Sequence, residues 1–441
     1  MARQPRSQSR APSRRRPPSS PDQPSAQAPE EIGHPVFAQP RPTPDPARFE
    51  VPHPPDTAAY RQIDELNREH KLFPLPFPVP RGGPEPRLTL AETLGPDGAK
   101  AVELITAAGQ LVFHSVGDTG NTRGPDPQNL VADKLVSDFE DPQANEVPQF
   151  LFHLGDVIYN FGEARYYYDQ FYDPYRDYPA PILALAGNHD GMVAPTTDTP
   201  PLSAWLENFS EPDFVVTPEA GGLSRTAQIE PGVFFTFEAP FVRILALYSG
   251  TLEDPGVIAA DNVGDSQLKF LQAALDRVKS DGYGGALIIA HHHPAYTAGS
   301  KHGWSIEMLK QIDAVCAKAG VWPHAVLSAH AHNYQRFTRV RGDTQIPYII
   351  AGGGGHGLVR LSRRNEPGPR TPAVIQSAGT GVDQVILENY DDQDYGYLRV
   401  VVTAQQLRIE YHPASDGSAA RTPDDFVTVD LASRRLVHFT G

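Results

Sequence analysis

Short runs of apolar residues recur along the chain from residue 110 onward, and each run stops at a polar or glycine-rich cluster. The runs are three to seven residues long and hold many β-branched or aromatic residues, a composition typical of buried strands. The predicted strands are Leu111–Val116, Phe150–Leu154, Ile182–Ala186, Val242–Tyr248, Ala286–Ala290, Val326–Ser328 and Tyr348–Ala351.

A second pattern, with apolar residues at helical spacing, lies between several of these runs. It predicts helices over Ser266–Ser280 and Ser305–Ala319. Strands that alternate with helices favour a layered α/β fold. Near the end of the chain, Tyr397–Thr403 and Gln406–Tyr411 are predicted to be antiparallel strands that close a second sheet.

The beginning of the chain has a different composition. The first 60 residues contain 15 prolines mixed with Ser, Gln and Arg, and the first 16 contain six arginines. Such a stretch buries too little apolar surface to offset its ordering entropy, so residues 1–58 are predicted to be a disordered Pro/Arg-rich tail. Residues 59–108 are predicted to wrap over a surface of the domain formed by residues 109–441, with secondary structure that the pattern does not define.

Composition and charge exclude several classes of protein. With 441 residues, 39% of them hydrophobic, the chain is able to bury a sizeable core. A net charge of −15 repels nucleic acid, so no stable nucleic-acid partner is expected. The single cysteine, Cys316, rules out a disulfide framework and any thiolate metal cluster.

The sequence also shows neither a predicted membrane span nor a predicted secretory signal peptide. No run of 18 apolar residues is present, so no membrane span is predicted. The basic N-terminus lacks an apolar central region, so it does not predict secretion, and we expect a cytoplasmic protein.

Five of the predicted strands are followed directly by residues that bind metals. The clusters are GDTG at 117–120, GDVIY at 155–159, GNHD at 187–190, HHHP at 291–294 and AHAH at 329–332. In open α/β sheets, ligands gather beyond the carboxyl ends of the strands. We therefore expect these five strand ends to converge on one place.

The chemistry of these clusters favours a dinuclear metal site. Asp, His, Asn and Tyr supply oxygen and nitrogen donors, which suit Fe, Mn, Zn or Co. Seven side chains with one shared carboxylate are enough for two metals about 3.5–4 Å apart. Each cluster alone has a simpler interpretation as a turn or helix cap, and the hypothesis depends on the ordered set of five.

These motifs resemble those of the calcineurin-like metallophosphoesterases, and within them most closely the purple acid phosphatases, over about residues 110–415. Tyr159 is the main pointer to that branch. The resemblance implies two packed mixed β-sheets flanked by helices, with the site at the strand ends. Ala329 departs from the family, which has glycine at that position.

The resemblance also implies a role for each residue. Asp118, Asp156, Tyr159 and His332 would hold the first metal, and Asp156, Asn188, His292 and His330 the second. The spacing to the following proline selects His292 over its neighbour His291. The implied metals are iron plus a second Fe, Zn or Mn ion.

Three further histidines are candidates near the site. The resemblance places His189 beside the phosphate and His302 near the leaving group, as catalytic residues. A solvent-exposed loop position is the equally simple interpretation of His302. His356, which follows the glycines Gly352–Gly355, is a candidate for a position behind the ligands. The aromatic stretch 165–172 is expected to pack in the core rather than to bind substrate.

The predicted function is a phosphomonoesterase in which a metal-bridging hydroxide attacks a small phosphate ester. One alternative is a phosphodiesterase of the same superfamily, acting on cyclic nucleotides or nucleic acid. Those members usually open with an Asp-x-His pair, and Gly120 replaces that histidine here. The other alternative is a metal-binding scaffold without catalysis. The sequence defines neither the substrate nor the oligomeric state.

Overall fold

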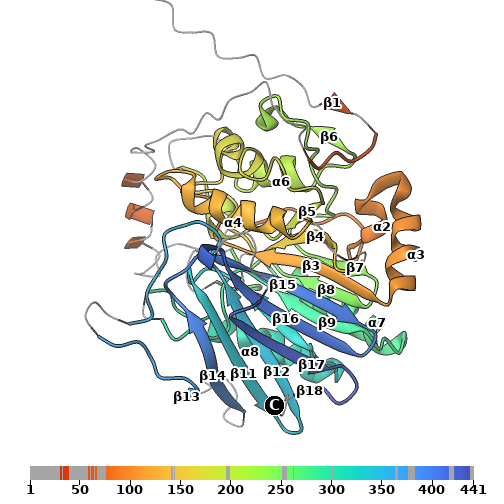
Figure 1. Ribbon diagram of the computed structural model, residues 1–441, viewed down its shortest axis with the longest axis vertical. Coiled ribbons are helices and arrows are strands. Elements are labelled where there is room, and N and C mark those ends of the chain that lie inside the picture. The colour runs from red at the N-terminus through yellow and green to blue at the C-terminus, as the bar shows by residue number, and fades with distance from the viewer. Residues whose placement is uncertain are drawn as a thin grey trace, which may run out of the picture.

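Two mixed β-sheets pack against each other in the computed structural model, with helices on their outer faces (Figure 1). This is the fold class predicted above. The structure describes residues 30–31, 33–38, 58–59, 61–63, 65–66, 76–140, 143, 145–194, 199–250, 256–261, 263–299, 301–362, 366–375, 383–416 and 422–437.

The first sheet has seven strands in the order β18-β17-β16-β15-β3-β4-β5. Its strands are β3 (Gln110–Val116), β4 (Pro148–His153), β5 (Ile182–Ala184), β15 (Gly396–Thr403), β16 (Gln406–Pro413), β17 (Asp425–Asp430) and β18 (Arg435–Leu436). The early strands β3, β4 and β5 are parallel, and β15 pairs antiparallel with β3. The C-terminal strands, blue in Figure 1, therefore extend the sheet that the early strands begin.

The second sheet has nine strands in the order β13-β14-β11-β12-β10-β9-β8-β7-β2. Its strands are β2 (Arg87–Thr89), β7 (Phe235–Ala239), β8 (Val242–Ala246), β9 (Ala286–Ala290), β10 (Ala325–Ser328), β11 (Tyr334–Arg341), β12 (Thr344–Ala351), β13 (Ala373–Ile375) and β14 (Gln384–Asp391). Strands β8, β9, β10 and β12 are parallel, so their carboxyl ends share one edge.

The alternation of side chains along each strand explains how both faces of these sheets are buried. In β4, Phe150 and Phe152 face the core between the two sheets, where Phe237 of β7 contacts Phe150 at a ring-centroid distance of 4.9 Å. Leu151 points the other way, into the layer of helices. Apolar runs without polar alternation are therefore what this sheet requires.

Helices cover the outer faces. They are α2 (Leu90–Thr93), α3 (Gly98–Ala108), α4 (Asp126–Ser137), α5 (Asn188–Gly191), α6 (Ser203–Phe209), α7 (Ser266–Ser280) and α8 (Ile306–Ala319). Short 3-10 helices lie at Gly95–Asp97, Ala164–Tyr166, Pro218–Ala220 and Ala414–Asp416, and a π-helical segment lies at Tyr168–Tyr172. The predicted span of α7 is confirmed to the residue. Ser305, predicted as the first residue of α8, is its N-cap and accepts a hydrogen bond from the Met308 amide.

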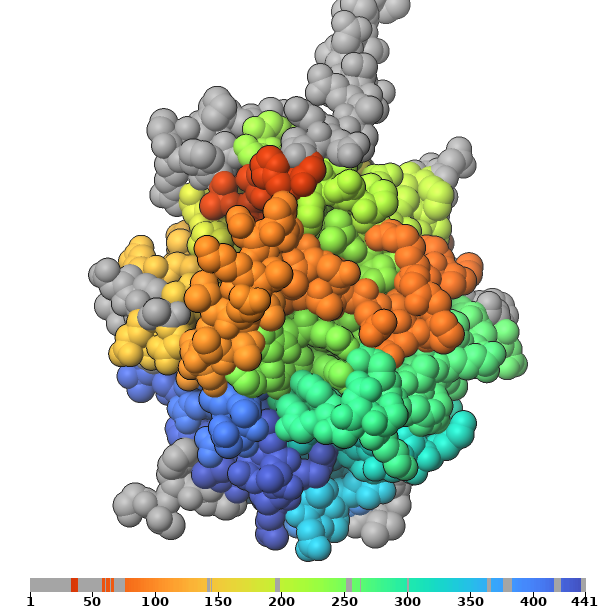
Figure 2. Space-filling view, turned by 90° about the vertical axis from the view of Figure 1, so that its right-hand side faces the viewer, coloured from red at the N-terminus to blue at the C-terminus, as the bar shows by residue number. Residues whose placement is uncertain are grey.

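The described part of residues 59–108 packs onto the domain rather than standing apart from it. Strand β2 pairs with β7 and so forms one edge of the nine-stranded sheet. Leu88, Leu90 and Ile105 enter the core between the sheets. Figure 2 shows α2 and α3, in orange, lying over this flank of the molecule.

Most of the predicted tail, residues 1–29, 32 and 39–57, lies outside the described residues. Two short stretches of it are described. β1 (Glu30–Glu31) pairs antiparallel with β6 (Val215–Val216), and the Val36 carbonyl accepts a hydrogen bond from the Thr226 amide at 3.0 Å. Among the helices of the described residues, none is long and apolar enough to cross a bilayer.

Candidate metal centre

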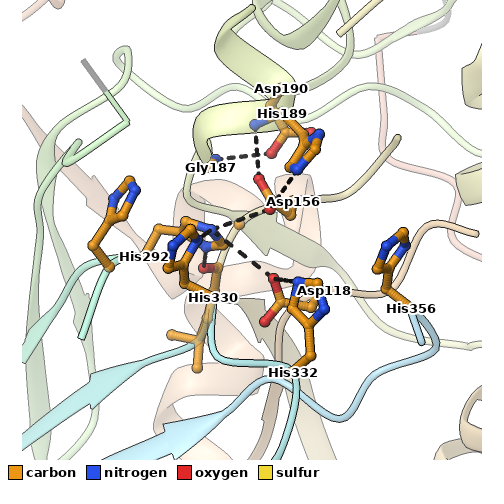
Figure 3. Close-up of polar contacts among 12 residues, drawn as sticks. Asp118, Asp156, Gly187, His189, Asp190, His292, His330, His332 and His356 are labelled. Atoms are coloured by element: carbon orange, nitrogen blue, oxygen red, sulfur yellow. Dashed lines mark hydrogen bonds and ion pairs between the residues drawn. The ribbon is translucent and has the colours of Figure 1, made fainter. Parts of the chain in front are cut away.

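The five motif loops come together at the carboxyl ends of strands from both sheets. Loops after β3, β4 and β5 of the seven-stranded sheet carry Asp118, Asp156 and Asn188. Loops after β9 and β10 of the nine-stranded sheet carry His292 and the pair His330 and His332. Figure 3 shows the two carboxylates facing the histidine rings across this junction.

Tyr159 lies between the two carboxylates. Its hydroxyl oxygen lies 3.0 Å from both Asp118 Oδ1 and Asp156 Oδ2, between which it has one proton to donate, and 3.4 Å from His332 Nε2. The His332 ring nitrogen is 3.8 Å from Asp118 Oδ1. These four side chains, which were the predicted ligands of the first metal, therefore surround one point.

A second set of donors surrounds the other side of Asp156. His292 Nε2 lies 3.2 Å from Asp156 Oδ2 and 3.3 Å from His330 Nδ1. Ligand atoms of Asp156, His292 and His330 all lie within 4.8 Å of one another. The loop of Asn188 contacts this set through its backbone, because the amide of the next residue, His189, donates to Asp156 Oδ1 at 3.0 Å.

Carbonyl groups behind the rings orient three of these histidines. The Nδ1 atoms of His292, His332 and His189 lie 2.8, 3.2 and 2.6 Å from the carbonyl oxygens of residues 154, 357 and 160. A carbonyl oxygen only accepts, so each Nδ1 carries the proton and each Nε2 presents a lone pair or a second proton toward the centre. This is the tautomer that a metal ligand needs.

The backbone at four of these residues is in a region that side chains rarely adopt. Asp118, Asp156, His330 and His332 have φ angles of 56°, 54°, 67° and 51°. Left-handed backbone costs a residue with a Cβ about 1–2 kcal/mol. The tertiary contacts of the loops must offset this cost. The left-handed backbone in turn directs all four side chains into one space.

Glycine is required at two positions beside Asp156. A Cβ on Gly187 would fall on Asp156 Oδ1, and one on Gly155 would lie 2.7 Å from His292 Nδ1. Gly155 also has φ of 93°. Ala329, where the resemblance implied glycine, is fully buried and does not have a positive φ. The residue with positive φ in this loop is the next one, His330, so alanine is accommodated at position 329.

The buried carboxylates set the charge of this centre. Burial alone would lower the pKa of His292, but Asp156 and Asp118 outweigh it and raise that pKa to about 9. Burial and the repulsion of Asp156 hold the pKa of Asp118 well above its ordinary value, although His292 opposes them. Burial would also raise the pKa of Asp156, but His292 and His189 hold it below the ordinary range. The centre therefore favours positive charge between its carboxylates.

Several buried polar atoms at this centre have no hydrogen-bond partner, and this indicates that the residues suit metal ions. Among the described residues, both amide atoms of Asn188, Asp118 Oδ2 and His330 Nε2 are buried and make no hydrogen bond. Polar atoms buried this way cost about 1–3 kcal/mol each unless something satisfies them. Oxygen and nitrogen donors around an anionic pocket are the ligands of Fe, Mn and Zn, so the residues fit two such ions.

The other candidate histidines also lie at this centre. The His302 ring is 4.7 Å from that of His330 and 4.9 Å from that of His332, and its Nε2 is buried. His302 therefore lies in a loop, as the alternative had it, but its side chain is half-buried rather than solvent-exposed. Burial, assisted by Lys301, lowers the pKa of His302 to about 3, so its ring is neutral.

His356 stacks on Tyr159 at a centroid distance of 3.7 Å and an interplanar angle of 16°. Its Nδ1 donates to the Gly120 carbonyl at 3.0 Å. The ring thus packs behind one predicted ligand and braces the loop that carries another, Asp118. Figure 3 shows His356 and His292 on opposite sides of Asp118.

Sequence reasoning gave Asp190 no role, although it ends the GNHD motif. Its fully buried carboxylate accepts from the amides of Gly187, Val157 and Ile158 at 2.8, 3.0 and 3.2 Å. It thereby joins the loops after β4 and β5, which hold Asp156 and Asn188. Its contact with the Gly187 amide is the half of a capping box in which a side chain three residues on accepts from the amide of the N-cap residue.

Two neighbouring features lie outside the ligand set. His291 Nδ1 donates to the carbonyl of His293 at 2.6 Å and its Nε2 is buried without a hydrogen-bond partner, whereas His292 Nε2 lies 3.2 Å from Asp156 Oδ2. In the aromatic stretch, Tyr166, Tyr167 and Phe171 are buried in the helix-side core, as expected.

Comparison with known proteins identifies the family. The family model for the calcineurin-like phosphoesterases matches residues 114–334, which is half of the chain and includes every predicted ligand. No curated protein matches the sequence.

Several solved structures are similar. GAP50, described as the anchor in the inner membrane complex of Plasmodium, is 14% identical with a TM-score of 0.51, and the match covers 73% of this chain and 89% of that one. PhoD is 13% identical with a TM-score of 0.43, covering 75% and 72%. A predicted phosphoesterase of Streptococcus pneumoniae is 9% identical with a TM-score of 0.27, covering 72% and 98%.

At these identities the likeness to GAP50 shows the shared fold alone. The family assignment comes from the family model and agrees with the two-sheet architecture and the five motif loops. The chain therefore belongs to the calcineurin-like phosphoesterase family.

Proposed function

We propose that the chain is a phosphomonoesterase that works with two metal ions, of the purple acid phosphatase type. The observation that supports it most is the Tyr159 hydroxyl, which lies 3.0 Å from both Asp118 and Asp156 and so adds a phenolic ligand beside a shared carboxylate. Asp118, Asp156, Tyr159 and His332 would hold one ion, and Asp156, Asn188, His292 and His330 the other.

Two bound ions would supply a lowered pKa for water and positive charge on the phosphoryl oxygens. The chain's own residues would do the rest. His189 has its Nδ1 proton fixed on the Asn160 carbonyl, which leaves Nε2, 4.0 Å from Asp156 Oδ2, to contact a phosphoryl oxygen. His302, a neutral ring with a buried and unpaired Nε2, would hydrogen-bond the leaving oxygen.

The direct test replaces the shared carboxylate. Asp156→Asn should lose bound metal and lower kcat/KM for p-nitrophenyl phosphate by about a thousandfold, the scale of losing a group that stabilises the transition state. The fold should persist, because Asn has nearly the same shape. Asp343→Asn, at an exposed turn between β11 and β12, is the matched control. Full activity in Asp156→Asn would falsify the proposal.

Specificity for monoesters is part of the proposal. Bis(p-nitrophenyl) phosphate, a diester with the same leaving group, should be hydrolysed at least tenfold more slowly than the monoester. The reverse order would assign the chain to the phosphodiesterases.

A scaffold role is the second candidate, because the GAP50 structure that shares this fold is described as an anchor. The complete donor set weighs against it. The activity of the metal-loaded chain separates the two, since a metal-binding scaffold would hold the ions without hydrolysing p-nitrophenyl phosphate. The cytoplasmic location stays a prediction from composition.

A further inference from the structure

A cleft of about 450 Å³ opens beside the proposed metal centre. Its lining comes from the turn after the first motif and the start of α4, the turn at residue 301, the loop after the glycine run, and the turn between β14 and β15. The residues that matter for its chemistry are Asn121, Arg123, Asp126, Lys301, His356 and Tyr395.

The cleft shares walls with the centre. His356 lines it and stacks on Tyr159 at 3.7 Å, while its amide donates to the Asp118 carbonyl at 2.9 Å. Gly357, also in the lining, accepts from His332 Nδ1 at 3.2 Å. Lys301 precedes His302, whose ring contacts His332. A phosphate ester held at the centre would therefore have its organic part close to this cleft.

The charge of the cleft is opposite to that of the molecule. Its described lining holds two cations, Arg123 and Lys301, against one carboxylate, Asp126, whereas the whole chain has a net charge of −15. Basic groups gathered in a concave site attract anions well beyond what their number suggests, because low-dielectric walls focus their field.

The turn that carries Arg123 is fixed in place. Asn121 is buried, its amide nitrogen donates to the Gly355 carbonyl at 2.8 Å, and its oxygen accepts from the Arg123 amide at 2.8 Å. The brace ties this turn to the residue just before His356. The backbone of Arg123 is thus fixed at the cleft, and its exposed side chain carries a planar guanidinium that suits a carboxylate or phosphate.

From these contacts we infer that the cleft is a subsite for the organic part of the substrate, and that it selects phosphomonoesters carrying a second anionic group. This inference rests on the proposed function and narrows its substrate class. Arg123 and Lys301 bind the second carboxylate or phosphate.

The test uses two esters of nearly the same shape. 3-Phosphoglycerate and glycerol 3-phosphate share a three-carbon skeleton and differ in a carboxylate against a hydroxymethyl group. The metal-loaded enzyme should favour 3-phosphoglycerate at least tenfold in kcat/KM. Arg123→Gln and Lys301→Gln should each reduce that ratio at least threefold, mainly through KM, and Asn121→Ala should act in the same direction.

The control Lys100→Gln makes the same charge change on the exposed face of α3 and should leave the ratio unaltered. Hydrolysis of p-nitrophenyl phosphate, which carries no second anionic group, should change less in Arg123→Gln and Lys301→Gln than hydrolysis of 3-phosphoglycerate. An enzyme that hydrolyses both esters equally, or a ratio unmoved by Arg123→Gln and Lys301→Gln, overturns this inference and leaves the proposed function standing. A metal-loaded chain that hydrolyses no ester overturns both.

Discussion

Tyr159 is held in a way that explains why a phenol suits this position. Burial, followed by the charges of Asp118 and Asp156, raises the pKa of Tyr159 well above its ordinary value, so its proton stays on without a strong Lewis acid. A metal ion in place of that proton would satisfy both carboxylates and the phenolate together. His356 keeps the ring in place by stacking on it.

If the first ion is ferric iron, the purified protein should have a visible charge-transfer band from Tyr159. Tyr159→Phe keeps the ring and its stacking on His356 but removes the ligand atom, so the band should disappear. Absorption spectra with parallel metal quantification check this. Tyr283 lies before the amino end of β9, where its ring packs under the Arg243 guanidinium. As the matched control, Tyr283→Phe should keep the band. An unchanged spectrum in Tyr159→Phe would contradict the ligand assignment, whereas an active, colourless, iron-free enzyme would indicate Mn or Zn.

The pattern of residues predicted some elements and missed others for a physical reason. Strands buried on both faces, such as β9 (Ala286–Ala290), are continuous apolar runs and were readily recognised. β11 (Tyr334–Arg341) was missed, because its arginines break the apolar pattern. Those arginines are paired through distant segments: Arg336 contacts Asp425, and Arg339 contacts Asp313. No local pattern reveals such partners.

The same limit applies to the candidate site. The donor residues and their order were readable, because each follows a strand. The left-handed backbone at Asp118 and His330, and the cap formed by Asp190, arise from contacts between loops far apart in the chain. The chain alone therefore predicted which residues gather, and the fold determined how each is aimed.

Another cluster of charges belongs to two strands of the seven-stranded sheet. Arg408, Glu410 and His412 alternate along β16 and so share one face, and Arg399 on β15 lies directly opposite Glu410. Glu410 contacts Arg408 at 2.6 Å and Arg399 at 3.1 Å. Burial would raise the pKa of Glu410, but His412, Arg408 and Arg399 lower it to about 2.

A carboxylate with a lowered folded-state pKa stabilises the protein above its unfolded-state pKa and loses that effect as the pH falls toward the folded value. Glu410→Gln should therefore cost about 2 kcal/mol at pH 7, allowing for partial solvent screening, and the cost should shrink between pH 5 and pH 3. Urea unfolding at several pH values measures it. Glu103→Gln, exposed on α3, should have no such pH-dependent cost. A constant difference across this range would show that Glu410 acts by shape rather than charge.

At the scale of the molecule, the proposed ions would cross-link the two sheets. Asp118, Asp156, Tyr159 and Asn188 come from loops of the seven-stranded sheet, and His292, His330 and His332 from loops of the nine-stranded sheet. Each proposed ion takes ligands from both sets. This junction gathers carboxylates and histidines, which repel their like when no cation is bound.

Removing metal should therefore lower stability as well as activity. Ligands that bind only the folded chain stabilise it by about 4 kcal/mol each when present at a thousand times their Kd. A strong chelator should accordingly lower Tm by several degrees, and added Mn²⁺ or Zn²⁺ should restore it. Differential scanning calorimetry measures the shift, with Asp156→Asn as the control, since a chain that no longer binds the ions should show the lower Tm with or without chelator. A Tm that chelation leaves unchanged in the wild-type protein, despite measured loss of metal, would mean that the core alone holds the sheets together.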